Sequence, residues 1–243
     1  MKKLHYKDLL ITHRAFWALE RRAKHYDTYM KEVKDWKKWP ESVDVFEIEK
    51  LLRFVPKWDM HLRMKNPSKV YSVYQDILPI VTKTKNLKLE STNLDAELKG
   101  DISKIFDMIA PCSEKAYEST DCSKILHTIL PHLIVMWDMK IREGVLGTEQ
   151  KKFGSQYASE FLPLMQTELR EALAICMENR KLTFQDAGAY VRSSCGYETL
   201  PKLVDEYNYV IHTKHDEFAS YLKDIKKQNK IEDEEYQRLT LKL

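Results

Sequence analysis

Glycine scarcity is the sequence feature that most constrains this chain. Only six of the 243 residues are glycine, the first is Gly100, and none follows an asparagine or an aspartate. The chain therefore has no G-x-G-x-x-G dinucleotide fingerprint and no P-loop, because both motifs need glycines at fixed spacing. Tight β-hairpin turns, which favour Asn-Gly and Asp-Gly, are not expected either. These absences predict an all-α protein.

Apolar residues recur with helical spacing along most of the chain, as this fold class requires. Capping residues and prolines mark several predicted boundaries. A capping box at Asp44 and Glu47 opens one helix, Asn66-Pro67 opens the next, and Asp101 is predicted to cap a third. Residues 83–93 are polar and predict a loop, whereas Pro163 predicts a kink in a long helix that runs to about Cys176.

Basic residues are concentrated at the N-terminus. Residues 1–40 contain eleven Lys or Arg and five Asp or Glu, interleaved with aromatic residues, although the whole chain carries only +3. This pattern is compatible with a nucleic-acid-binding surface. The alternative is that these charges form the solvated face of a long amphipathic helix.

Cysteine spacing and the N-terminal sequence predict where the protein resides. The four cysteines include no C-x-x-C pair, and a chain of this size with so few cysteines is expected to be reduced and intracellular. No signal peptide and no transmembrane segment are predicted, so we expect a cytoplasmic protein without a membrane partner. His212 and His215, with Asp216, form only a weak metal pattern, and we expect neither a metal nor another cofactor.

The region from Ser123 to Arg142 carries the strongest candidate for chemistry. Five apolar residues, 133–137 (LIVMW), lead directly to Asp138, which stands where a helix N-cap would stand. An apolar run before a helix N-terminus would hold an ionised, rigid carboxylate that can stabilise developing positive charge. The alternative is that Asp138 only caps the helix.

This region resembles the helix-hairpin-helix DNA glycosylase superfamily. Residues 123–131 (SKILHTILP) resemble the buried helix of that family, and 137–142 (WDMKIR) resemble its aspartate segment, with Arg142 one position early. The resemblance implies two helical subdomains with a cleft between them, and the excision of a damaged or modified base from duplex DNA by base flipping. It also implies that Asp138 is the catalytic aspartate.

The chain departs from this family at two points. Residues 113–120 (SEKAYEST) replace the glycine-rich hairpin turn, and the lysine of the backbone-cleaving members falls, counted without a gap, on Thr120. Lys124 follows one helical turn later, either as a displaced Schiff-base lysine or, as we prefer, as a phosphate or pocket contact. A monofunctional glycosylase is therefore expected.

The remaining predicted roles divide between the base and the phosphates. The candidates for contact with the base are Trp137, His127, Trp58 and Tyr197. The candidates for contact with DNA are Ser123, Lys140, Arg142 and Arg192.

We predict a monomer with an N-terminal subdomain (1–95), a catalytic subdomain (96–195) and C-terminal helices (196–243) that pack back on the N-terminal part. The alternative function is a non-catalytic helical domain that binds DNA or another protein.

Overall fold

The computed structural model of the protein describes residues 3–21, 23, 43–58, 67–113, 119–147, 153–196 and 199–243, with the side chains of 54–58 and 119 excepted. Every regular element within these ranges is a helix, and they contain no strand. The predicted all-α class is therefore confirmed. None of the helices in these ranges is long and apolar enough to cross a membrane.

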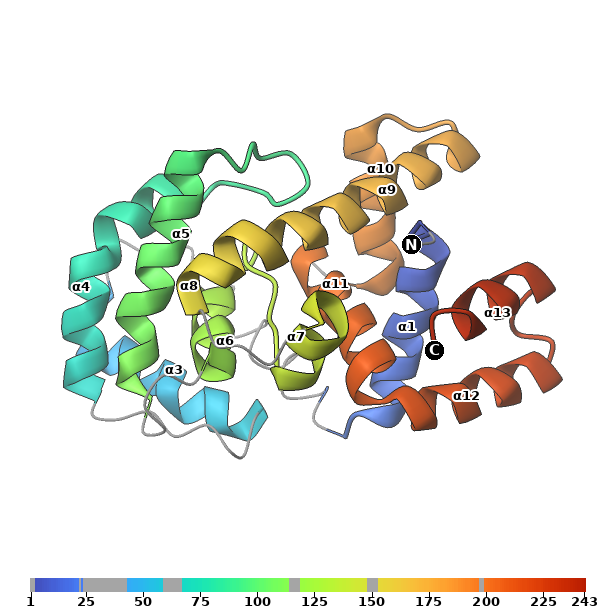
Figure 1. The fold of residues 1–243 in the computed structure, drawn as a ribbon, viewed down its shortest axis with the longest axis horizontal. Helices are drawn as coiled ribbons and strands as arrows, with labels where there is room; N and C mark the ends of the chain where they lie inside the picture. The colour runs from blue at the N-terminus through green and yellow to red at the C-terminus, as the bar shows by residue number, and fades with distance from the viewer. Residues whose placement is uncertain are drawn as a thin grey trace. The chain divides into compact units, whose positions relative to one another are not determined.

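Residue contacts divide the chain into two compact units, coloured by residue number in Figure 1. Unit 1 contains Met1–Arg21 and Met165–Leu243, and unit 2 contains Arg22–Leu164. The predicted boundary at 95 falls inside unit 2, and the predicted boundary at 195 falls inside unit 1. The division into subdomains at those two residues stays a prediction.

Unit 2 is built around α5 (Ala96–Ile109), which packs against α4, α6 and α8, while α3 packs against α4 and α6. Figure 1 shows α4 and α5 side by side, joined at one end by a loop. The other helices of this unit are α3 (Val45–Trp58), α4 (Pro67–Thr84), α6 (Ser119–Ile129), α7 (Met139–Leu146) and α8 (Phe153–Gln156). Short 3₁₀ and π segments lie at Ala110–Cys112 and Tyr157–Phe161.

Local capping signals located some helix starts correctly and one incorrectly. Asp44 Oδ1 accepts the Glu47 N–H at 2.9 Å before α3, and α4 begins at Pro67, both as predicted. The prediction that Asp101 caps α5 is wrong. Asp95 is the N-cap and accepts the Leu98 N–H at 2.9 Å; the helix begins six residues earlier than predicted, which places Asp101 in its interior.

A π-helical turn lies just before Pro163, where the sequence predicts a kink. Proline has no N–H, so it cannot donate to the carbonyl one turn earlier. The residues just before it, Tyr157–Phe161, form π-type bonds, and the Leu162 N–H reaches the Tyr157 carbonyl. The α-helix then continues as α9 (Leu162–Arg180).

Unit 1 surrounds α1 (Tyr6–Leu19), which packs against four helices of the C-terminal half. These are α10 (Phe184–Cys195), α11 (Leu200–Asn208), α12 (His215–Lys227) and α13 (Asp233–Thr240), with a π turn at Tyr209–Thr213. The first helix of the chain thus forms a core with its last ones.

Two buried ionic clusters hold α1 in this core. At one, the Lys202 ammonium lies 2.6 Å from Asp205 and 4.4 Å from the Phe16 ring centre, while Glu206 accepts from His13 at 2.8 Å.

At the other cluster, fully buried Asp8 accepts from Arg238 Nε at 2.8 Å and lies 3.7 Å from the Lys242 ammonium. Burial lowers the pKa of Lys242 and raises the pKa of Glu168 to about 7. The Glu168 Oε2 atom is buried and has no hydrogen-bond partner among the described residues.

Candidate active site

The apolar residues before Asp138 form a buried, extended segment between two helices of unit 2. Helix α6 ends at Ile129, a turn follows, and residues 133–137 are each at most 2% exposed. This is the extended segment that the sequence predicts. Because it belongs to no sheet, its backbone groups need partners from side chains.

Three side chains supply those partners. The His127 ring donates from Nδ1 to the Ile134 carbonyl at 2.7 Å. The Tyr157 hydroxyl accepts the Val135 N–H at 3.0 Å and donates to the Val135 carbonyl at 2.6 Å. The buried Ser123 hydroxyl accepts the Trp137 N–H at 3.3 Å, and its single proton lies within reach of two carbonyls, those of Thr120 at 2.9 Å and Trp137 at 3.1 Å. The backbone is thus fixed at three points in the four residues before Asp138.

Asp138 is the N-cap of α7, as the sequence predicts. Its backbone is extended (φ −113°, ψ −177°), and its Oδ1 accepts the Ile141 N–H at 2.8 Å. The carboxylate is partly exposed, in contrast to the buried residues before it. This bond supplies an acceptor to one of the backbone N–H groups that the first turn of α7 leaves without a partner inside the helix.

Trp137 lies in the aromatic core of the unit. It is 1% exposed, and its ring centre lies 5.0 Å from that of Phe161 and 5.1 Å from that of Tyr157. The Arg142 guanidinium lies 5.5 Å from the same ring and is also buried. The indole Nε1 is buried without a hydrogen-bond partner among the described groups. Contact of Trp137 with a substrate base stays a prediction.

Ser123 and His127 bond to the segment that leads to Asp138, and Lys124 lies between them on the same helix. Ser123, Lys124 and His127 share α6, on which Lys124 is half-buried and His127 is fully buried. Lys140 is exposed on the first turn of α7. No thiol nucleophile is offered here, since burial raises the pKa of the Cys122 thiol well above its ordinary value.

The structure does not test the remaining candidates. Arg192 belongs to α10 of unit 1. Trp58 is the last residue of α3, but its side chain lies outside the described groups, and Tyr197 lies outside the described residues. So do Lys2, Arg22 and residues 24–42, which together carry seven of the eleven basic residues of the predicted N-terminal face.

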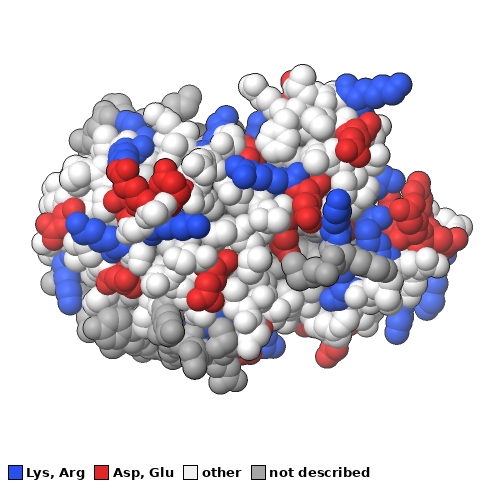
Figure 2. Space-filling view, turned by 45° about the horizontal axis from the view of Figure 1, so that its top comes forward, with Lys and Arg blue, Asp and Glu red and all other residues white. Residues whose placement is uncertain are grey.

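Surface charge on the described face in Figure 2 is mixed. Blue and red side chains alternate over it, without one extended basic patch. Phosphate contacts on this face would therefore come from individual lysines and arginines rather than from a continuous basic surface.

Tyr157 is the site residue that sequence reasoning missed. The sequence alone places it only among the apolar positions of the long helix that runs to about Cys176. Its partner, Val135, lies 22 residues earlier in the chain. No local signal connects the two, because the bond depends on how the π turn packs against the extended segment.

The described residues contain no group of three His, Cys, Asp or Glu side chains placed to hold a metal ion. Comparisons of the chain with protein-family models, curated proteins and solved structures found no match. The functional argument therefore rests on the geometry around Asp138.

Proposed function

We propose that this protein is a DNA glycosylase that excises a damaged or modified base, with Asp138 as its catalytic carboxylate. The observation that carries the proposal is that neighbouring groups hold Asp138 in a fixed position. A partly exposed carboxylate follows a buried segment whose backbone is fixed by Ser123, His127 and Tyr157, and it caps a helix. Rigid placement of a charged group is what electrostatic catalysis requires.

The proposed reaction breaks the N-glycosidic bond of one extruded nucleotide. Extrusion from the duplex exposes the bond between the sugar C1′ and the base nitrogen. As this bond breaks, its electron pair leaves with the base and positive charge develops on the sugar. Asp138 stabilises that charge and orients a water, whose oxygen bonds to C1′ while its proton is lost to solvent or to the departing base. The products are the free base and an abasic site.

The family resemblance adds two expectations to this proposal. One is a helix-hairpin-helix glycosylase-like arrangement, with the cleft between two helical subdomains. The other concerns Lys124, which the proposal assigns to a phosphate or pocket contact. A monofunctional enzyme should give no borohydride-trapped protein–DNA complex, and trapping that is lost in Lys124→Ala would instead assign a Schiff base to this lysine.

Asp138→Asn separates catalysis from capping. Asparagine caps a helix as well as aspartate does, so the free energy of unfolding should change by about 1 kcal/mol or less. The rate of base release should fall by about 10²–10³-fold, because the charge opposite the developing cation is lost. The measurement is chromatographic detection of bases released from duplexes that carry a panel of modified bases, together with alkali-labile sites.

Asp44→Asn is the matched control. Asp44 caps α3 in the same unit through the same kind of bond to a backbone N–H, so this variant should retain the wild-type rate. A folded Asp138→Asn protein that released base as fast as the wild type would reduce Asp138 to a helix cap.

That outcome would favour the second candidate, a helical DNA-binding or protein-interaction domain without catalysis. The observation on its side is the burial of Trp137 and His127, both of which have packing or hydrogen-bonding roles in the core of the unit.

A further inference from the structure

The last helix of the chain, α13, docks on unit 1 with little apolar surface. It packs against α1 and α12, and Figure 1 shows it joined to α12 by a short connection. Of its eight residues only Glu235 and Leu239 are buried, and Ile231, just before the helix, is buried as well. Two buried apolar side chains make a small hydrophobic contribution to the docking of a helix.

Ion pairs connect α13 and the residues after it to two adjacent residues of α1. The Lys7 ammonium lies 2.6 Å from Glu235. The next residue, Asp8, is fully buried, accepts from Arg238 Nε at 2.8 Å and lies 3.7 Å from the Lys242 ammonium. Each of the two opposite charges on α1 thus meets its complement near α13.

The contacts after the end of α13 are also polar. The Lys242 ammonium donates to the Tyr207 hydroxyl at 3.0 Å and lies 5.1 Å from the centre of that ring. The His215 Nε2 atom of α12 lies 2.7 Å from the Leu243 carbonyl oxygen. All these contacts join the last residues of the chain to other helices, so movement of α13 away from α1 would break several of them together.

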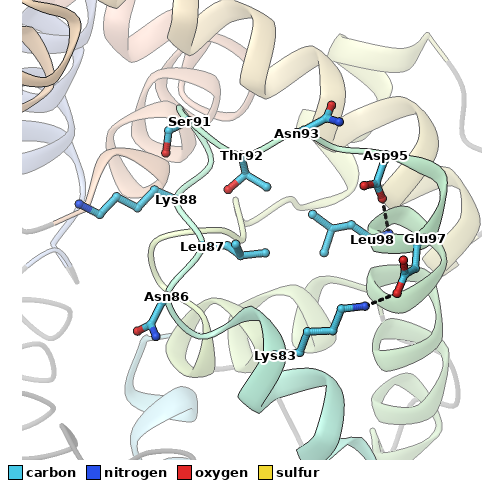
Figure 3. Close-up of a pocket in the computed structure, with 10 residues that line it drawn as sticks. All are labelled: Lys83, Asn86, Leu87, Lys88, Ser91, Thr92, Asn93, Asp95, Glu97 and Leu98. Atoms are coloured by element: carbon cyan, nitrogen blue, oxygen red, sulfur yellow. Dashed lines mark hydrogen bonds and ion pairs between the residues drawn. The ribbon is translucent and has the colours of Figure 1, made fainter.

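Helix α5 shows the opposite balance of charge and apolar contact. Figure 3 shows Lys83 of α4 paired with Glu97 of α5, beside a pocket of about 410 Å³ that the intervening loop encloses. Helix α5 also buries five apolar side chains, so its packing does not depend on that pair. In α13 the ion pairs replace most of the apolar contact.

The connection between α12 and α13 contains a residue suited to a hinge. Helix α12 ends at Lys227, and Asn229 has a left-handed backbone (φ 54°), which asparagine adopts more readily than most residues. Across the connection, Lys226 pairs with Asp233, whose side chain is 83% exposed. A surface pair of this kind contributes little to docking.

We propose that α13, with the residues after it, is an electrostatic latch that detaches from α1 as one unit while the rest of unit 1 stays folded. Release separates the Asp8 carboxylate from both of its cationic partners. A helix of eight residues is not stable by itself in water, so α13 unfolds when it is released. The latch does not depend on the proposed chemistry of Asp138.

Amide hydrogen exchange on the full chain, resolved by residue with NMR, tests this proposal. The hydrogen-bonded amides of α13 should exchange at one common rate, because they are exposed in a single opening event. That rate should be about a hundredfold or more above the rates in α11, all of whose residues are buried.

Arg238→Gln should accelerate exchange in α13 by about tenfold or more and leave α11 unchanged, because it removes a charged donor to buried Asp8. Glu234→Gln is the matched control. The Glu234 side chain is 88% exposed and lies 3.6 Å from Arg238 within the same helix, so its loss should change the rate by about twofold or less.

Salt provides a second measurement that needs no variant. In ~1 M sodium chloride the Debye length falls to about 3 Å, which weakens the partly exposed pair of Lys7. Exchange in α13 should rise by about two- to fivefold, and exchange in α5 should stay unchanged.

Three results would overturn the proposal. The first is exchange in α13 at the rate of α11, which would mean that α13 opens only when the unit unfolds. The second is a gradient of rates that rises toward Leu243, which would indicate fraying rather than one opening event. The third is an equal response to Arg238→Gln and Glu234→Gln.

Discussion

The two units bury polar groups in different ways. In unit 2, the residues before Asp138 are held by the polar side chains of Ser123, His127 and Tyr157, which bond to backbone groups. In unit 1, α1 is held by charges: Asp8 lies against Arg238 and Lys242, and Lys202 against Asp205 and Glu206. The first arrangement leaves one carboxylate, Asp138, partly exposed at its edge, whereas the second encloses its carboxylates.

This difference has a physical consequence. Hydrogen bonds from the hydroxyls of Ser123 and Tyr157 to backbone change little near neutral pH, so they can hold a neighbouring group at a fixed position. Buried ion pairs depend on the protonation of both partners, and removal of one partner leaves an uncompensated charge. The stability of unit 1 should therefore depend on charge and pH. The stability of unit 2 should depend on its hydrogen bonds and on close packing.

The largest effect is expected from Asp8→Asn in unit 1. The variant keeps the size of the side chain but leaves Arg238 and Lys242 without their buried counter-charge, which should cost about 3–5 kcal/mol of unfolding free energy. Glu97→Gln is the control, because it breaks an ion pair whose carboxylate is 77% exposed and should cost about 1 kcal/mol or less. Urea unfolding measures both, and equal losses would remove the contrast between buried and exposed pairs.

The pH response of unit 1 is tested by Glu168→Gln. Burial raises the pKa of Glu168 from 4.5 to about 7, against the opposing charge of Lys242. Between these two pH values, Glu168 keeps its proton in the folded protein and loses it in the unfolded chain. Stability should therefore fall as the pH rises through this window, by about 3 kcal/mol from this group.

Glu168→Gln should remove that part of the decline, so the variant is more stable than the wild type at pH 8 and similar to it at pH 4.5. Urea unfolding at a series of pH values checks this, with Glu178→Gln, an exposed glutamate of the same helix, as the control. If the stability of Glu168→Gln still fell with rising pH as it does in the wild type, another group would be responsible for the decline.

In unit 2, the stability should be most sensitive to close packing, rather than to charge, at Gly154. A Cβ atom there would lie 2.2 Å from the Ser103 carbonyl oxygen of α5 and 2.8 Å from Asp107 Oδ1. Gly154→Ala should therefore destabilise the protein by about 3 kcal/mol, because backbone must move. Gly100→Ala is the counterpart: it meets no atom within 4 Å in α5 and should stabilise the helix by about 0.5–1 kcal/mol. Thermal unfolding would show opposite shifts, and two shifts of the same sign would contradict the packing of α8 on α5.

Among the variants expected to destabilise a buried group, Tyr157→Phe has the smallest expected effect. It removes the hydroxyl that bonds to both the N–H and the carbonyl of Val135, at a cost of about 2 kcal/mol. Tyr71→Phe, at a half-buried tyrosine of α4, should cost less than 0.5 kcal/mol, as a substitution away from such bonds usually does. If Asp138 is catalytic, Tyr157→Phe should also slow base release. A variant with unchanged stability would show that the extended segment is held without this hydroxyl.

The sequence was most informative where a structural feature depends on neighbours a few residues apart. Asp44 and Asp138 were identified as caps because a cap bonds to a backbone N–H three residues later, and Pro67 was identified as a helix start because its φ and missing N–H suit the first turn. The same reasoning failed at Asp101, where the helix continues from an earlier cap, and a good capping residue in a helix interior looks no different in sequence.

The features of the candidate site also separate into those that follow from neighbouring residues and those that follow from helix packing. The sequence by itself determined the all-α class, the apolar segment and the capping position of Asp138, since these follow from composition, spacing and short-range hydrogen bonds. Only the tertiary structure decided that Trp137 and His127 lie in the core, that Tyr157 holds Val135, and that the loop after α4 encloses a pocket. The physical reason is that these contacts join residues from different helices, and burial at such positions is set by which helices pack together.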